Sequence, residues 1–89
     1  MAIPTEAEVI LSPNPTVSET TVAFKLPSEQ SFRVQLFDLS GRLIYDQEAV
    51  GDSGDNLINL RLNGLAPGVY LLNFQTDGVK TQKKLVIQE

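Results

Sequence analysis

The sequence predicts an all-β domain, a seven-stranded antiparallel β-sandwich of the immunoglobulin-like type. Apolar residues recur at every second position in several short segments, and no segment sustains the 3.6-residue period of a helix. Glycine, proline and aspartate separate these segments at short intervals, as the turns of a sandwich require. A tyrosine also follows shortly after the pair Pro67-Gly68, and β-sandwiches often place a buried tyrosine at such a strand corner.

Seven segments are assigned to strands from their alternation and from the residues that interrupt it. The assigned ranges are 8–11, 20–26, 32–39, 42–45, 57–62, 69–75 and 80–88. The first is a short apolar run, and the second alternates cleanly up to Pro27. The third and fourth flank a tight connection, where Asp38 can cap the turn and Gly41 can adopt a positive φ. The polar stretch 47–56 before the fifth is expected to be the longest loop, and Asp77-Gly78 predicts a hairpin between the last two.

The segment 64–72 combines a turn with the start of the sixth strand. Pro67 fixes φ at about −65° and Gly68 tolerates a positive φ, so the pair suits the centre of a type II turn. Gly64 precedes it in the same turn region. Tyr70 is expected to cover one end of the core, with its hydroxyl reaching back to the turn backbone.

Composition limits the function. The chain has 89 residues, enough for one domain, and 42% of them are hydrophobic. It has no cysteine and no histidine, which removes the thiol nucleophile, the imidazole base and two common metal ligands. Its net charge of −4 argues against nucleic acid as a partner, and no apolar run reaches the roughly 20 residues that span a bilayer. We therefore expect neither an enzyme nor a cofactor-binding protein.

Two ligand sites are weighed against simpler interpretations. Oxygen-bearing side chains that could bind calcium are those of Asp46, Glu48, Asp52, Asp55 and Asn56. Their spacing fits no EF-hand loop, and the same residue types are common in any exposed loop. Carbohydrate-binding sandwiches usually present exposed aromatic platforms, and only Phe37 and Tyr45 lie outside the predicted core faces. A carbohydrate-binding or structural module of a secreted enzyme remains the alternative function.

The last predicted strand carries Lys83-Lys84 directly before an apolar run. Lysines on a final strand can protect a sheet edge against aggregation. Alternation places Leu85 and Ile87 in the core. The residues then expected to face solvent are Lys84, Val86 and Gln88. An exposed valine between polar neighbours indicates a surface made for a partner, and an edge strand can be added to another protein's sheet.

Four separated motifs resemble the C-terminal sorting domain (type A) of proteins exported by the type IX secretion system of Gram-negative bacteria. In chain order they are Pro13-Asn14-Pro15, the hairpin block 36–45 with Asp38 and Gly41, the block 62–72 with Gly64, Pro67, Gly68 and Tyr70, and the basic-then-apolar strand from Lys83 to Gln88. The resemblance covers about residues 9–88. Each motif alone is weak, and their order is what makes the resemblance specific.

The resemblance implies a signal rather than a catalyst. Domains of this family are fused behind a cargo protein, are recognised by an outer-membrane translocon, and are usually removed by a sortase-like peptidase. The expected organisation is a linker remnant at 1–8 and a monomeric sorting domain at 9–89. The expected location is the periplasm in transit, then the outer-membrane surface or the exterior. Candidate recognition residues are Pro13, Asn14, Pro15, Lys83, Lys84, Val86 and Gln88.

Overall fold

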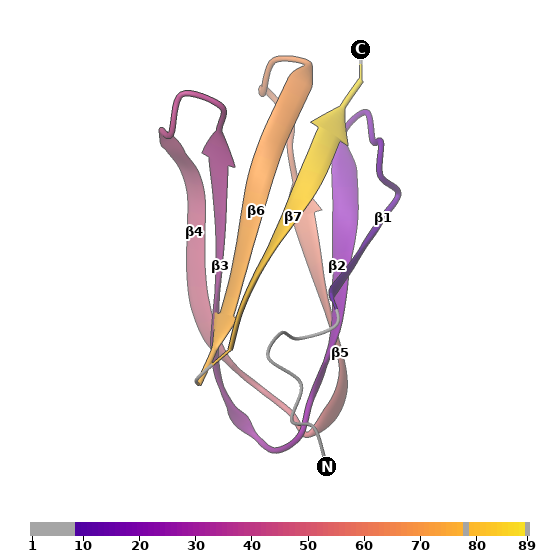
Figure 1. The fold of residues 1–89 in the computed structure, drawn as a ribbon. Coiled ribbons are helices and arrows are strands. Elements are labelled where there is room, and N and C mark those ends of the chain that lie inside the picture. Colours follow the sequence, from indigo (N-terminus) through magenta and orange to yellow (C-terminus); the bar gives the residue numbers. More distant parts are fainter. Residues whose placement is uncertain (1–8, 78, 89) are drawn as a thin grey trace.

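The computed structural model describes residues 9–77 and 79–88, which form seven strands in two antiparallel sheets (Figure 1). The strands are β1 (Val9–Ser12), β2 (Glu19–Leu26), β3 (Gln30–Asp38), β4 (Leu43–Gly51), β5 (Gly54–Arg61), β6 (Gly68–Thr76) and β7 (Val79–Ile87). Sheet A has the order β1-β2-β5, and sheet B has the order β4-β3-β6-β7. The predicted immunoglobulin-like sandwich is therefore confirmed. The described residues include no helix long and apolar enough to cross a membrane.

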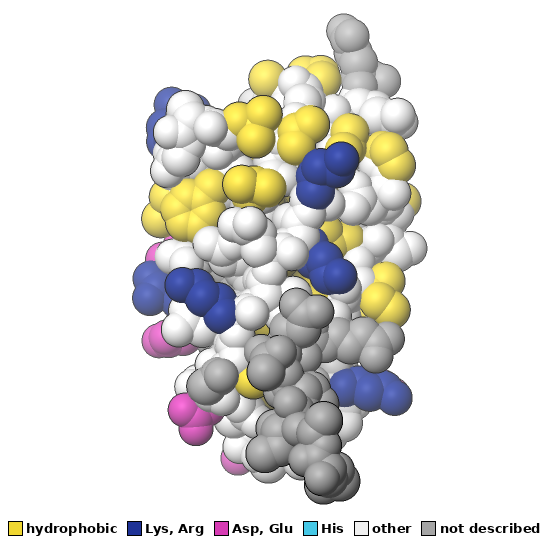
Figure 2. Space-filling model, in the orientation of Figure 1, with side chains coloured by type: hydrophobic (Ala, Val, Ile, Leu, Met, Phe, Trp, Pro, Cys, Tyr) yellow, Lys and Arg dark blue, Asp and Glu magenta, His cyan; other side chains and the backbone are white. Residues whose placement is uncertain are grey.

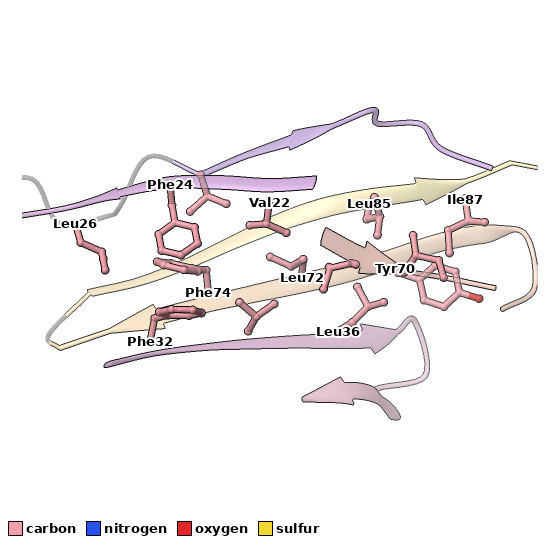
Figure 3. Close-up of a cluster of buried hydrophobic side chains, with 14 residues drawn as sticks. Val22, Phe24, Leu26, Phe32, Leu36, Tyr70, Leu72, Phe74, Leu85 and Ile87 are labelled. Atoms are coloured by element: carbon pink, nitrogen blue, oxygen red, sulfur yellow. The ribbon is translucent and has the colours of Figure 1, made fainter. Parts of the chain in front are cut away.

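The core lies between the two sheets and is built from alternate residues of the strands (Figure 3). Its buried hydrophobic residues are Val9, Val22, Phe24, Leu26, Phe32, Val34, Leu36, Leu60, Leu62, Tyr70, Leu72, Phe74, Leu85 and Ile87. The ring centroid of Phe24 lies 4.9 Å from that of Phe32 and 4.5 Å from that of Phe74. Figure 3 shows these three rings at one end of the core and Tyr70 at the other. The burial of Leu85 and Ile87 that alternation predicts is thus confirmed.

The polar stretch 47–56 is not a loop, and that prediction is wrong. β4 continues to Gly51 and β5 begins at Gly54. Along β4, Gln47 and Ala49 lie opposite buried residues of β3, so the strand does alternate. β4 is an edge strand of sheet B, where one face and one edge meet water. The inner positions of an edge strand can therefore be a glutamine and a small alanine. The large apolar residues by which a central strand is recognised in the sequence are then absent.

Asp38 caps the connection between β3 and β4, as the sequence predicts. Its Oδ1 accepts hydrogen bonds from the Ser40 hydroxyl at 2.6 Å, the Ser40 amide at 2.9 Å and the Arg42 amide at 3.0 Å. These bonds, led by that of the Ser40 hydroxyl, hold the pKa of Asp38 below its ordinary value. Gly41 has the expected positive φ, 92°. The hairpin between β6 and β7 also forms, since Thr76 pairs with Val79, although Gly78 lies outside the described residues.

The turn before β6 differs from the prediction. Gly68 has a φ of 154°, far from the value of about +80° that the second central residue of a type II turn requires, so that assignment at Pro67-Gly68 is wrong. The tight turn lies a few residues earlier. The amide of Leu65 donates to the carbonyl of Leu62 at 3.2 Å, and Gly64 between them has a φ of 88°. The positive φ that this turn needs is therefore supplied by Gly64.

Tyr70 occupies the strand corner that the sequence predicts. Its side chain is buried at the end of the core, with 7% of the residue exposed. Its hydroxyl donates a hydrogen bond of 2.6 Å to the carbonyl of Ala66, in the segment that enters β6. The ring thus closes the core while the hydroxyl ties the preceding connection to the strand.

Candidate functional site

The edge of β7 is covered near its end by residues 13–16, which we call the clasp. The side-chain amide of Asn14 donates to the carbonyl of Lys84 at 2.8 Å and accepts from the amide of Val86 at 3.0 Å. A carboxamide offers one donor and one acceptor side by side, so Asn14 pairs with the edge as a peptide group would. Two sequence motifs separated by 70 residues are thereby joined.

Thr16 extends the clasp by backbone pairing. Its amide donates to the carbonyl of Val86 at 2.9 Å, and its carbonyl accepts from the amide of Gln88 at 2.7 Å, so that Thr16 forms a parallel bridge with β7. The clasp is held from its other side as well. The hydroxyl of buried Thr20 donates to the carbonyl of Pro13 at 2.7 Å. Sequence reasoning missed Thr16 and Thr20, because a threonine carries no signal of such a role.

The structure therefore gives Pro13-Asn14-Pro15 a structural role. Both prolines follow cis peptide bonds and are exposed. The carbonyl of Pro13 accepts the Thr20 hydrogen bond, and Asn14 makes the contacts to β7. The motif holds the last strand in place and lies beside the outward residues of that strand.

We expect Asn14→Ala to lower the free energy of unfolding by about 1–2 kcal/mol, because two backbone groups of β7 lose their partner. The loss should lie at the lower end, since the site is exposed and water can replace the amide. Urea denaturation measures it. Asn59→Ala is the matched control, because this asparagine is exposed on β5, and its loss should stay below about 0.5 kcal/mol. Equal losses for both variants would show that the Asn14 side chain adds no stability through the clasp.

A second feature, the outward face of sheet B, adjoins the clasp. Cross-strand partners form a row from Leu43 on β4 through Phe37 and Leu71 to Lys84 on β7. In the next outward row, Val69 pairs with Val86. The five apolar members, which we call the apolar patch, are Phe37, Leu43, Val69, Leu71 and Val86. Leu43 is 46% exposed and the other four are half-buried, and none belongs to the core or packs against it. Figure 2 shows hydrophobic side chains gathered on the upper half of the molecule, with basic side chains among and below them.

The candidate recognition residues of β7 divide between two faces. Lys84 and Val86 lie on the outward side, as expected, although Val86 is half-buried rather than exposed, and Gln88 is exposed just beyond the end of the strand. Lys83 pairs with buried Leu72, so it belongs to the core-facing side of the strand and reaches water only at the sheet edge. An inward lysine on an edge strand protects that edge against pairing with other chains. Lys83 is therefore separated from the other three.

The aromatic residues considered for carbohydrate binding lie on opposite faces of sheet B. Phe37 belongs to the apolar patch. Tyr45 pairs with buried Leu36, packs against the core, and donates its hydroxyl to the side chain of Gln47. The two rings cannot form one flat platform, because a sheet separates them.

Three of the oxygen-bearing side chains considered for calcium, those of Asp46, Asp55 and Asn56, have other partners. Asn56 closes the connection between β4 and β5, accepting from the Asp52 amide at 3.0 Å and donating to the Asp52 carbonyl at 2.9 Å. Asp46 receives two hydrogen bonds from Arg33, of 2.7 and 2.9 Å, and this contact lowers the pKa of Asp46. Among the described residues, no three acidic side chains lie close enough together to hold a metal ion.

Comparison with solved structures identifies the fold. The chain superimposes on part of PorU from Porphyromonas gingivalis, solved as a latent dimer, with a TM-score of 0.74 and 23% identity over 97% of this chain. It spans 10% of the length of that PorU chain. A weaker similarity, with a TM-score of 0.52 and 16% identity, covers 94% of this chain and 16% of a mutant β-glucosidase from Listeria innocua, solved in complex with laminaribiose. At these identities the similarities show a shared fold.

Comparison of the sequence identifies the family. No curated protein matches the chain. Residues 11–88 match the family described as the secretion system C-terminal sorting domain. The matched region includes the clasp, the apolar patch and all of β7. Because the match covers nearly the whole chain, this protein belongs to the family of type IX secretion C-terminal sorting domains.

Proposed function

We propose that this domain is the signal by which a fused cargo protein crosses the outer membrane through the type IX secretion system. Membership of the sorting-domain family assigns it to an exported protein. The finer steps belong to the proposal. The outer-membrane translocon reads the folded domain, a sortase-like peptidase removes it, and the cargo ends on the cell surface or outside the cell. The domain itself acts as a recognition module and performs no chemistry.

The observation that carries the proposal is the clasp. It joins the two segments at opposite ends of the family match, Pro13-Asn14-Pro15 and the last strand, through hydrogen bonds across 70 residues. Leu85 and Ile87 of that strand are buried in the core. The C-terminal motif is therefore an integral strand, and the signal is a folded surface rather than a flexible tail. In this organisation residues 9–89 are the signal, and residues 1–8, outside the described part, belong to the linker.

The proposal predicts that residues 1–89, fused behind a reporter, move the reporter out of a type IX-competent strain. Export should fall by about tenfold or more when the translocon is deleted, because no component then recognises the domain. Reporter activity in medium, surface and periplasmic fractions measures the effect. The reporter without the domain is the control. Export that is equal with and without the domain would contradict the proposal and favour a binding or structural module instead.

A further inference from the structure

We infer that the apolar patch and the outward lysines of β7 form a docking surface for a protein whose own surface places carboxylates beside an apolar centre, on the side that meets β7. The inference rests on the proposed function, since that protein would be the reader of the signal. The inference specifies which surface of the domain the partner contacts and which kinds of side chain the partner uses.

The charge of β7 indicates an anionic partner. The chain is acidic, with a net charge of −4, yet three of its seven basic residues lie on this strand, Lys80 and Lys84 on the outward face and Lys83 at the edge. The ion pairs within the described residues join Lys25 to Asp55, Arg33 to Asp46 and Arg42 to Asp38. None of these pairs involves β7. A strand whose cations have no ion-pair partner among the residues that the structure describes is complementary to an anionic partner.

The apolar patch lies beside these charges and provides the apolar centre of an interface. Leu71 of the patch pairs directly with Lys84, and Val69 pairs with Val86 two residues further along β7. Apolar contact and positive charge are therefore adjacent on one face. Protein interfaces typically combine an apolar centre with a polar or charged rim. The patch is the centre of such an interface, and Lys84 belongs to its rim.

Acidic residues on the same face favour a protein over a lipid surface. The outward row that contains Lys80 continues through Gln75 and Arg33 to Glu48, and Asp46 lies in the neighbouring row. The face thus has cations along β7 and the carboxylate of Glu48 on β4, while Asp46 is paired with Arg33. A uniformly anionic membrane would repel the β4 side. A protein surface can present opposite charges to both sides.

The clasp determines how the partner approaches. The edge groups of β7 between Lys84 and Gln88 already pair with Asn14 and Thr16. A partner therefore meets the side chains of the face instead of adding a strand at this part of the edge. The same bonds hold these residues in one conformation before binding, which reduces the entropy that docking must overcome.

The outward face of sheet A offers a matched control surface. It also exposes apolar side chains, with Ile10 at 54% and Leu57 at 73%, beside a shallow hollow of about 370 Å³. The lysine beside this hollow, Lys25, has its Nζ 3.9 Å from the carboxylate of Asp55. Within the described ranges, this face therefore has exposed apolar area and a lysine that is already ion-paired, instead of the group of unpaired lysines seen on β7.

The first experiment uses the reporter fusion. Lys84→Glu with Val86→Thr should reduce export about tenfold, because it reverses the rim charge and shrinks the patch while leaving the buried residues of β7 unchanged. Lys25→Glu with Leu57→Thr makes the same changes on sheet A, and its export should stay within about twofold of the parent. Circular dichroism and melting of the purified domains check that both variants fold. Equal export by the two folded variants would overturn the inference. If the parent domain itself directs no export, the proposed function fails instead.

The second experiment tests the chemistry of the partner. A carbodiimide joins a lysine amine to a carboxylate in direct contact. The purified domain, treated with the outer-membrane fraction of a competent strain, should yield an amide mapped by mass spectrometry from Lys84 or Lys80 to an aspartate or glutamate of another protein. Lys80→Arg with Lys84→Arg should lose this link, since arginine keeps the positive charge but lacks the primary amine that the carbodiimide couples.

Two further outcomes would overturn the inference by assigning the surface to a different occupant. Lys84-dependent sedimentation with vesicles of equal phosphatidylethanolamine and phosphatidylglycerol would assign it to a membrane. Self-association in sedimentation equilibrium, lost in the Lys84→Glu and Val86→Thr variant, would assign it to a second copy of the chain. The expected result is a monomer that does not bind these vesicles.

Discussion

Phe74→Ala is expected to lower the free energy of unfolding by about 3–5 kcal/mol, the usual loss for truncating a fully buried phenylalanine. Phe74 has no exposed surface, and its ring contacts those of Phe24 and Phe32, with centroids 4.5 and 6.0 Å away. Alanine would leave a cavity between the sheets that three large rings now fill. A domain of this size is stable by only about 5–13 kcal/mol, so the variant should unfold at much lower urea concentration.

Phe37→Ala is the matched control for that variant. Phe37 lies on the same sheet but on its outward face, half-buried in the apolar patch. Its loss should cost about 1 kcal/mol or less, because no enclosed cavity forms. If Phe37→Ala proved as destabilising as Phe74→Ala, the assignment of the two residues to opposite faces of sheet B would be wrong. The two variants together therefore test the register on which the apolar patch depends.

Tyr70→Ala is expected to cost about 3 kcal/mol, since the ring closes one end of the core. The hydroxyl accounts for a smaller share, through its hydrogen bond to the Ala66 carbonyl. Tyr70→Phe keeps the ring and removes only this bond, so it should cost about 1 kcal/mol. Chemical denaturation of the three proteins separates the two contributions.

The corner role of Tyr70 fails under either of two results. A loss below about 0.5 kcal/mol for Tyr70→Ala is typical of surface substitutions and would mean that the ring is not part of the core. Equal losses for Tyr70→Ala and Tyr70→Phe would mean that the hydrogen bond, and not packing, is the whole contribution. Secretion of either folded variant should remain near that of the parent, because Tyr70 lies on the inner face and the proposed docking surface on the outer one.

Local alternation was sufficient to identify most strands of this sandwich. The inward faces of 20–26, 32–39 and 69–75 are visible in the sequence because burial of one face imposes a period of two on neighbouring residues. The same pattern did not predict β4 beyond Tyr45, although the strand continues to Gly51. At the sheet edge its inner positions include Gln47 and Ala49, so the pattern lacks the large apolar residues that make alternation visible.

Turns were predictable where one side chain acts on nearby backbone. Asp38 caps its own turn, and Tyr70 bonds a carbonyl four residues back, so both roles could be read from adjacent sequence. The sequence predicts the turn at Pro67-Gly68, whereas it lies at residues 62–65. Both Gly64 and Gly68 are followed by residues that could begin a strand, so the local sequence does not distinguish them. Which glycine adopts φ near +80° is decided by where β5 ends and β6 must pair, and that is not a local property.

The sequence by itself determined the fold class, the inward faces of the central strands and the motifs that indicate a sorting domain. The tertiary structure decided how those motifs meet. Asn14 and Val86 are 72 residues apart, and their hydrogen bond exists only once the two sheets have closed over the core. The apolar patch likewise depends on the order β4-β3-β6-β7, which places Phe37 beside Leu71 and Leu71 beside Lys84. A period of two shows which face of a strand a side chain occupies, but only the pairing of strands shows which side chains become neighbours.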